Sequence, residues 1–395
     1  MTNWMYSLLS HPGSGLFVAG VVGLLGVLIV RLAPRVGRRW IRAIGAGVSA
    51  VAALLAIGGA VSMVRIKTAM AKFPPPGRLV DVGGYRMHIL AEGDAKGGPT
   101  VIWIPGSHEA GLNLNHLHQA IREETRSILF DRPGTGWSDA GPYPRTTARE
   151  AGELATLLDR AGEKGPFILI GHSYGGLLAA NFARRYPSKT AALVMADGTP
   201  PDVFMYLPDG GGPDIPGGIV RRSRAAAWMK MFAISPAWFA RAPAGPPDTG
   251  TVRLMKTIQG RLADVAPALA ATRTAPDWAT VSIFEEWLDP KAVADLMVYD
   301  LELGSLPVFV VTPAGKAPPE EVQAIGVSAA ETDRARHFLE QARMRYVRIS
   351  SKAELIHTAP GTGHNYPFET PEFLLDVVRR ALADSAMRSA KAAAP

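Results

Sequence analysis

The chain contains no cysteine among its 395 residues. Disulfide bonds, thiolate metal sites and a cysteine nucleophile are therefore excluded, while the cellular compartment stays open. Acidic residues are missing from the first 78 positions, which carry nine Lys or Arg side chains. The rest of the chain holds 33 basic and 35 acidic side chains, so the net charge of +7 originates in the N-terminal part. A nucleic-acid binder would concentrate basic residues on its folded domain, so we expect no nucleic-acid partner.

Two long runs near the N-terminus lack charge altogether. The first 30 residues have no charged side chain, and a second uncharged run covers the 22 residues 43–64. Each is long enough to cross a hydrocarbon core of about 30 Å. We therefore expect residues 1–72 to form a membrane anchor with helices at about 14–33 and 43–64, whose glycines allow close packing. A cleaved secretory signal is disfavoured, because no basic residue precedes the first run and a second run follows.

Basic residues around the two runs bear on their orientation. Five arginines lie between the runs, and such loops are typically cytoplasmic. They are Arg31, Arg35, Arg38, Arg39 and Arg42. This arrangement predicts a multi-pass membrane protein whose main domain lies outside the cytoplasm. Arg65, Lys67 and Lys72, which follow the second run, argue for the opposite orientation.

The remainder of the chain alternates between strand and helix patterns. A proline-rich segment at 73–78 predicts a stiff linker. Two short alternating runs then flank Gly83-Gly84, which indicates a hairpin. Further strands are expected at 101–104, 127–130, 167–170, 191–195, 308–311 and 354–359, and helices at 147–161, 177–186 and 371–383. Such alternation predicts an α/β fold with a mainly parallel sheet covered by helices on both faces.

One interval breaks this alternation. Residues 198–305 begin with a Pro/Gly-rich stretch and continue with helical patterns at 224–232, 252–269 and 290–301. The interval is too long for a simple crossover between strands. We expect a helical cap above the carboxyl edge of the sheet, where open α/β sheets bind ligands. The core domain would then comprise residues 79–197 and 306–390.

The strongest motif is Gly171-His-Ser173-Tyr-Gly175, directly after an expected buried strand and directly before an expected helix. This is the G-x-S-x-G pattern of a nucleophile elbow. The strand-to-helix turn is so tight that only small residues fit on either side of the serine. The turn also holds the hydroxyl at a helix N-terminus, which favours negative charge. Ser173 is therefore the candidate nucleophile.

Four sequence blocks occur in a characteristic order, and with them the chain resembles the α/β-hydrolase superfamily. They are Trp103-Ile-Pro-Gly-Ser107, Asp131-Arg-Pro-Gly-Thr-Gly-Trp-Ser-Asp139, the elbow and Gly361-Thr-Gly-His364. The resemblance, to capped esterase-like serine hydrolases, covers about residues 79–385. It implies that His364, just before the final helix, is the general base. An imidazole suits that role because its pKa lies near neutrality.

The same resemblance implies an oxyanion hole made by two backbone N–H groups. One comes from the residue after the nucleophile, here Tyr174. The other comes from the loop after the third strand, where Ser107 is the expected donor. Many relatives have His-Gly where this chain has Pro105-Gly106, a departure that leaves the choice of the second donor open.

The acidic member of the triad departs from the commonest pattern. The loop after the strand at 308–311, where relatives usually carry an Asp, contains none. Some members place the acid one strand earlier, and Asp197 matches that position. An acid in either place can hold the histidine tautomer. Asp197 is the first candidate, and Glu320, Glu321 and Asp202 are alternatives.

A Ser–His–acid set predicts acyl transfer to water without a metal or cofactor. Carboxylic-ester hydrolysis is the expected reaction. The cap is rich in aromatic residues and Met, which favours an ester with an apolar acyl or alcohol group. A proline-iminopeptidase-like aminopeptidase is an alternative, with Glu285, Glu286 or Asp289 holding the substrate amine. A non-catalytic ligand-binding module on the same fold is a second alternative.

Overall fold

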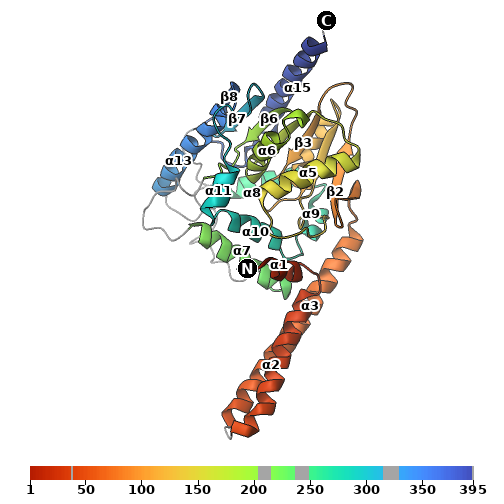
Figure 1. Cartoon of the computed structure of the whole chain (residues 1–395), viewed down its shortest axis with the longest axis vertical. Coiled ribbons are helices and arrows are strands. Elements are labelled where there is room, and N and C mark those ends of the chain that lie inside the picture. The colour runs from red at the N-terminus through yellow and green to blue at the C-terminus, as the bar shows by residue number, and fades with distance from the viewer. Residues whose placement is uncertain (37–38, 203–214, 236–248, 315–328, 394–395) are drawn as a thin grey trace.

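A long helical hairpin projects from one end of the molecule, and the C-terminus lies at the opposite end (Figure 1). The computed structural model describes residues 1–36, 39–202, 215–235, 249–314 and 329–393.

Eight strands form a single sheet in the order β1-β2-β4-β3-β5-β6-β7-β8. The strands are β1 (Arg78–Asp81), β2 (Arg86–Glu92), β3 (Thr100–Ile104), β4 (Ser127–Phe130), β5 (Phe167–His172), β6 (Thr190–Ala196), β7 (Pro307–Thr312) and β8 (Lys352–His357). β2 pairs antiparallel with both β1 and β4, and every other neighbouring pair is parallel. The mainly parallel sheet and the N-terminal hairpin of strands predicted from the sequence are confirmed.

Apolar side chains fill both faces of this sheet, because its central strands are buried along their whole length. Successive residues of a strand point to opposite faces. Ile102 therefore joins the apolar cluster on one face, and Trp103 joins the cluster on the other. The first cluster includes residues of α5 (Thr147–Ala161) and α6 (Tyr174–Arg185), with Tyr346 of α13 (Ala329–Arg348). The second includes α4 (Asn115–Ile121) and α15 (Pro371–Ala393).

Helices occupy the described part of the chain between β6 and β7. They are α7 (Ile215–Met231), α8 (Thr249–Arg261), α9 (Ala266–Thr272), α10 (Trp278–Glu286) and α11 (Pro290–Leu296). Figure 1 shows α7, α9 and α10 between the sheet and the helical hairpin. The assignment of residues 198–305 to a separate cap domain stays a prediction.

The predicted helix at 252–269 is wrong as a single element. The chain forms two helices there, α8 and α9, and Pro267 lies in the first turn of α9. Proline cannot lie inside a helix without losing a backbone hydrogen bond and meeting the preceding turn, whereas it fits a first turn well. Likewise, the helix predicted at 290–301 ends at Leu296, because Met297 adopts an extended backbone.

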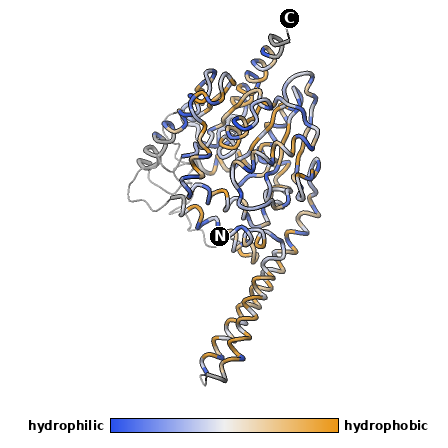
Figure 2. The backbone as a smooth tube through the Cα atoms, in the orientation of Figure 1, coloured by the Kyte–Doolittle hydropathy of each residue, from blue (hydrophilic) through white to orange (hydrophobic). Residues whose placement is uncertain are grey.

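The hairpin consists of α2 (Ser14–Val36) and α3 (Arg39–Lys72), preceded by the short helix α1 (Asn3–Leu9). Both long helices are candidate membrane spans by length and composition. Figure 2 shows that apolar residues cover their projecting part. Large apolar side chains are exposed all along it, among them Leu24, Leu54 and Ile57.

Glycines bring α2 and α3 close together at two levels. A Cβ atom at Gly45 would lie 2.9 Å from the Gly26 carbonyl oxygen, and one at Gly59 would lie 2.8 Å from the Gly15 carbonyl carbon. Small residues permit this kind of backbone approach between apolar helices. Gly58 instead faces the Phe232 carbonyl oxygen, at 2.5 Å from its would-be Cβ. The close packing of the two helices therefore depends on glycine at a few particular positions.

Cysteine cross-linking tests this hairpin directly, because the chain has no cysteine of its own. A Cβ atom at Gly23 would lie 3.5 Å from the Ala52 Cβ, a separation that disulfides adopt. We expect Gly23→Cys/Ala52→Cys to form a disulfide in the full chain upon oxidation. After trypsin cleavage in the arginine-rich loop, the two helices should stay linked on a non-reducing gel. The control pair Gly20→Cys/Ala52→Cys should separate, since Gly20 faces open space. Equal linkage of both pairs would contradict the packing.

Candidate active site

Ser173 lies in the sharp turn between β5 and α6, with a backbone φ of 56° and ψ of −125°. A positive φ is rare for a residue other than glycine and marks strain that functional sites often hold. The residues two positions before and after it must be glycines. A Cβ atom at Gly171 would lie 2.3 Å from the Gly175 carbonyl oxygen, and one at Gly175 would lie 2.0 Å from the Ile104 carbonyl oxygen. The G-x-S-x-G segment therefore has the geometry of a nucleophile elbow.

Asp197 follows β6 directly and is buried. Its N–H donates to the Val311 carbonyl oxygen at 2.8 Å, which fixes the residue at the carboxyl end of the sheet. Its Oδ2 accepts a hydrogen bond from His364 Nδ1 at 2.6 Å, and its Oδ1 lies 2.9 Å from Arg343 Nη2. Burial alone would raise the pKa of Asp197, but Arg343 and His364 lower it to about 2. Asp197 is therefore a carboxylate at neutral pH.

His364 lies in the loop between β8 and α14 (Tyr366–Glu369). Because Nδ1 donates to Asp197, Nε2 is the ring atom left to accept a proton. The His172 ring packs against the His364 ring with 4.7 Å between centroids, and His172 Nε2 lies 3.0 Å from the His364 carbonyl oxygen. These two contacts hold the histidine loop against the end of β5.

The backbone of Ser173 is fixed to the segment that carries Asp197. Its N–H donates to the Ala196 carbonyl oxygen at 3.1 Å, and its carbonyl oxygen accepts from the Thr199 N–H at 2.9 Å. Within the residues that the structure describes, the Ser173 hydroxyl makes no hydrogen bond to the His364 ring. In apo enzymes, the contact between nucleophile and base often tightens only when substrate binds.

The loop after β3 is held by one buried side chain. Arg132 donates to the carbonyl oxygens of Pro105, Gly106 and Ser107 at 2.9, 2.8 and 2.7 Å. Among the described residues, no acceptor is found for the N–H of Ser107 or of Tyr174. These are the two groups that the resemblance assigned to an oxyanion hole.

The same loop carries Glu109, a residue that the sequence analysis did not single out. Glu109 Oε2 accepts from the Gly106 N–H at 2.8 Å and lies 3.9 Å from His172 Nδ1. A Cβ atom at Gly106 would lie 3.0 Å from that oxygen and 3.6 Å from the Ser173 Cβ. Burial raises the pKa of Glu109, but His172 and the Gly106 N–H lower it to about 2. An ionised carboxylate therefore lies next to the elbow.

Of the alternative acids, Asp202 lies in the described part of the chain, where it pairs with an arginine and not with His364. Asp202 is buried, and its Oδ2 lies 3.0 Å from Arg345 Nη2. Glu320 and Glu321 lie outside the described residues. In the described ranges, no cluster of three or more His, Asp or Glu side chains is arranged to hold a metal ion.

The sequence pattern of the Alpha/beta hydrolase family matches residues 101–377, which include the elbow, Asp197 and His364. The chain belongs to this family. The fold of this α/β hydrolase is shared with a thermophilic esterase from Thermogutta terrifontis, at a TM-score of 0.53 and 19% sequence identity. That comparison covers 78% of this chain and 98% of the esterase. At this identity, the likeness concerns the fold alone.

Among proteins compared by sequence, the hydrolase is 27% identical over 237 residues to a cis-3-alkyl-4-alkyloxetan-2-one decarboxylase from Xanthomonas campestris pv. campestris. This match covers 54% of the chain and 79% of the decarboxylase. The chain is also 29% identical over 133 residues to the uncharacterized protein YbdG of Bacillus subtilis. This second match covers 33% of the chain and 40% of that relative.

Glu286 joins the helices after β6 to the core of the hydrolase. It lies at the end of α10, is buried, and accepts hydrogen bonds from both the N–H and the hydroxyl of Thr147, the first residue of α5. Burial raises the pKa of Glu286 to about 7, and the charge of Glu150 adds to this effect, while the bonds from Thr147 oppose it. The folded protein therefore favours the protonated form of Glu286.

The raised pKa of Glu286 predicts a pH dependence of stability. A group whose pKa is higher in the folded state makes its full contribution to the stability of the fold at pH values below its unfolded pKa. This contribution is lost as the pH rises through the folded pKa. The full chain in detergent should therefore have a lower Tm at about pH 8 than at about pH 5. The variant Glu286→Gln should lose most of this difference, while Glu123→Gln, an exposed control, should keep it. The same pH dependence in all three proteins would contradict the assignment.

Proposed function

We propose that this α/β hydrolase is a serine hydrolase that cleaves carboxylic esters, with Ser173 as nucleophile, His364 as general base and Asp197 as the acid. One observation carries the proposal. The imidazole of His364 is held by a buried carboxylate, Asp197, at 2.6 Å, on a loop packed against the strand that ends directly before the strained Ser173. A positioned base oriented by an acid beside a serine elbow is the arrangement of acyl transfer.

The chemistry follows from these groups. His364 Nε2 takes the hydroxyl proton while Ser173 Oγ attacks the ester carbonyl carbon, and Asp197 stabilises the imidazolium that forms. The negative oxygen of the tetrahedral intermediate accepts from the N–H groups of Ser107 and Tyr174. The intermediate collapses, and the alcohol leaves with the proton from His364. Water then attacks the acyl-enzyme with His364 again as base, and the carboxylic acid is released.

Arg343 supports the acid in this scheme as a positioning residue. Its guanidinium lies 2.9 Å from Asp197 Oδ1, on the side of the carboxylate away from the atom that His364 engages. The ion pair keeps Asp197 ionised although it is buried. A fixed carboxylate in turn holds the histidine in the tautomer whose Nε2 accepts a proton.

The substrate class rests on the apolar surroundings of α7 and α10. Trp228 packs on Trp278, and Phe284 stacks on Trp287. These four side chains pack on one another, and the proposal of an apolar acyl or alcohol group rests on the aromatic content of these helices. The name of the Xanthomonas relative refers to alkyl-substituted oxetan-2-ones, which are cyclic esters with apolar chains. Such a lactone offers the same acyl carbonyl to Ser173, so it belongs among the substrates to be tested.

The acids named for the aminopeptidase alternative have partners within the described residues. An amine site would require a carboxylate without another partner. Glu285 pairs with Arg224, Glu286 accepts from Thr147, and Asp289 caps the first turn of α11. The three acids predicted to hold an amino group are thus engaged in structural contacts.

The two apolar helices complete the proposal. We infer that α2 and α3 span a membrane, because their exposed surface is apolar over a length that a bilayer would cover. The arginine-rich loop between them then faces the cytoplasm, and the catalytic body lies on the other side.

Fluorophosphonate labelling tests the proposed function. The reagent forms a covalent bond with an activated serine, so the full chain in detergent should be labelled and should hydrolyse p-nitrophenyl butyrate. Ser173→Ala should abolish both, because the attacking hydroxyl is gone. Ser351→Ala, an exposed serine next to β8, should change neither. Equal labelling of the Ser173→Ala variant would contradict Ser173 as the nucleophile, and no labelling of the unmodified chain would favour the non-catalytic alternative.

A further inference from the structure

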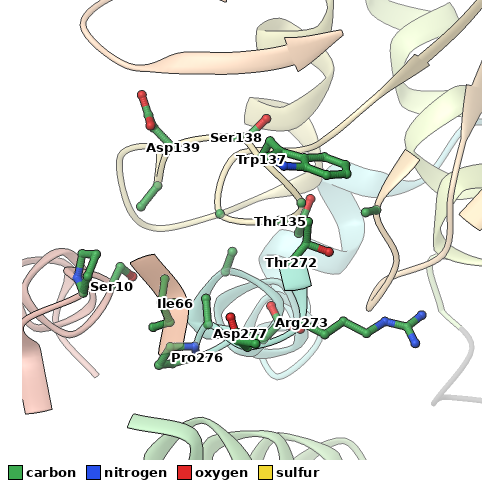
Figure 3. A pocket seen from close by; sticks show the side chains of 18 of the residues that line it. Ser10, Ile66, Thr135, Trp137, Ser138, Asp139, Thr272, Arg273, Pro276 and Asp277 are labelled. Carbon is green, nitrogen blue, oxygen red and sulfur yellow. The ribbon is translucent and has the colours of Figure 1, made fainter. Parts of the chain in front are cut away.

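A pocket of about 760 Å³ lies where the helical hairpin, the helices after β6 and the core meet. Ile66 and Met70 of α3 form part of its wall, Lys230, Thr272 and Asp277 come from the segment between β6 and β7, and His108 to Ala110 come from the loop after β3. Figure 3 shows Ser10, Ile66, Thr272 and Asp277 around the same space as Trp137. Its volume lies within the range of about 300–1,000 Å³ that is usual for small-molecule sites.

The pocket extends to a residue that lies close to the elbow. Glu109 lines the pocket, and its carboxylate also bonds to the Gly106 N–H beside the Ser173 Cβ. His108, which precedes it, binds Asp277 at 3.0 Å and so connects the β3 loop to the start of α10. Glu109 is therefore a lining residue of the pocket that also contacts the backbone next to Ser173.

The part of α3 that lines the pocket follows directly after the apolar surface of this helix. The last large apolar side chain exposed on this helix is Val64, and the exposed Arg65 and Lys67 follow. A change from apolar to basic surface marks the level of lipid headgroups on a spanning helix. Ile66 and Met70 are four residues apart, so they share one face of the helix, and that face lines the pocket. The pocket therefore begins at the expected surface of the bilayer.

The N-terminal segment closes another side of the pocket. Ser10 Oγ lies 2.6 Å from the Tyr143 hydroxyl, and Tyr6 stacks on the Tyr143 ring at 5.0 Å. Ser10 and Tyr143 both line the pocket. The anchor thus contributes walls to the pocket from both of its ends, α1 and the end of α3.

We propose that this pocket binds an uncharged, long-chain carboxylic ester that enters from the bilayer along Ile66 and Met70, with the ester group at the Glu109 end. The proposal rests on the proposed function of Ser173. A single alkyl chain suits the apolar wall that Ile66 and Met70 of α3 form. Both basic and acidic side chains line the rest of the pocket, which suits a polar head group without a charge of its own; they are Lys230, Arg273, Glu109, Asp139 and Asp277. Glu109 must turn away from the Gly106 N–H before the carbonyl group of the ester can reach Ser173. Only ligands that occupy the pocket then gain access to the nucleophile.

Narrowing the pocket tests this proposal. The full chain would be reconstituted in phosphatidylcholine nanodiscs, with monooleoylglycerol in the bilayer and p-nitrophenyl acetate in solution as substrates. Ile66→Trp should lower the ratio of long-chain to short-chain turnover about tenfold or more, because the added ring fills the space of the chain. Val64→Trp, two residues earlier on the exposed face, should leave this ratio unchanged. An unchanged ratio in Ile66→Trp would overturn the proposal, as would hydrolysis of the phosphatidylcholine itself.

Photocross-linking keeps the test independent of how the variant folds. A diazirine-bearing fatty-acyl ester in the same nanodiscs should label the unmodified chain at 66–70 and 272–279, and monooleoylglycerol should compete. Labelling confined to outward residues of the hairpin, such as Leu24 and Leu54, would exclude the pocket. If p-nitrophenyl acetate is hydrolysed but monooleoylglycerol is not, the pocket assignment fails and the serine hydrolase stands. Absence of both activities would instead remove the proposed function.

Discussion

A hydrogen bond of 2.6 Å joins Asp197 to His364, two residues that lie 167 positions apart in the chain. The order of the strands makes this contact, because β6 and the strands that follow it bring the ends of β6 and β8 to the same edge of the sheet. The bond selects the histidine tautomer, and Arg343 keeps its acidic partner ionised. Ser173 follows directly after the neighbouring strand, β5. Every chemical role proposed for its hydroxyl depends on the bond between Asp197 and His364.

Part of this arrangement could be predicted from the sequence. These are the features for which a residue type, such as glycine in a tight turn, serves a single physical purpose. The glycines around Ser173 indicated the tight turn, and the structure shows that any side chain there would meet the backbone of Ile104 or Gly175. The buried strands followed from their apolar runs. The assignment of catalytic roles to Ser173, His364 and Asp197 remains a prediction that the geometry supports.

Other features depend on packing between distant segments, which no local pattern records. Arg343 lies on a helix that the sequence analysis did not predict, and Glu109 is an isolated acid in a loop. Only the folded backbone places them beside Asp197 and Gly106. The helical hairpin of α2 and α3 was similarly expected to be a separate anchor. In the structure, however, the Ser62 hydroxyl of α3 donates to the Lys230 carbonyl oxygen at 2.9 Å. The anchor thus packs on the helices above the site.

Comparison of two buried acids tests the central claim most directly. Asp197 and Asp202 each pair with an arginine of α13, but only Asp197 binds His364. With p-nitrophenyl butyrate, Asp197→Asn should lower kcat about 10³- to 10⁴-fold, because the histidine loses its tautomer. Asp202→Asn should retain most of the activity. Equal losses in both variants, or full activity of Asp197→Asn, would contradict the assignment of Asp197 and the account built on it.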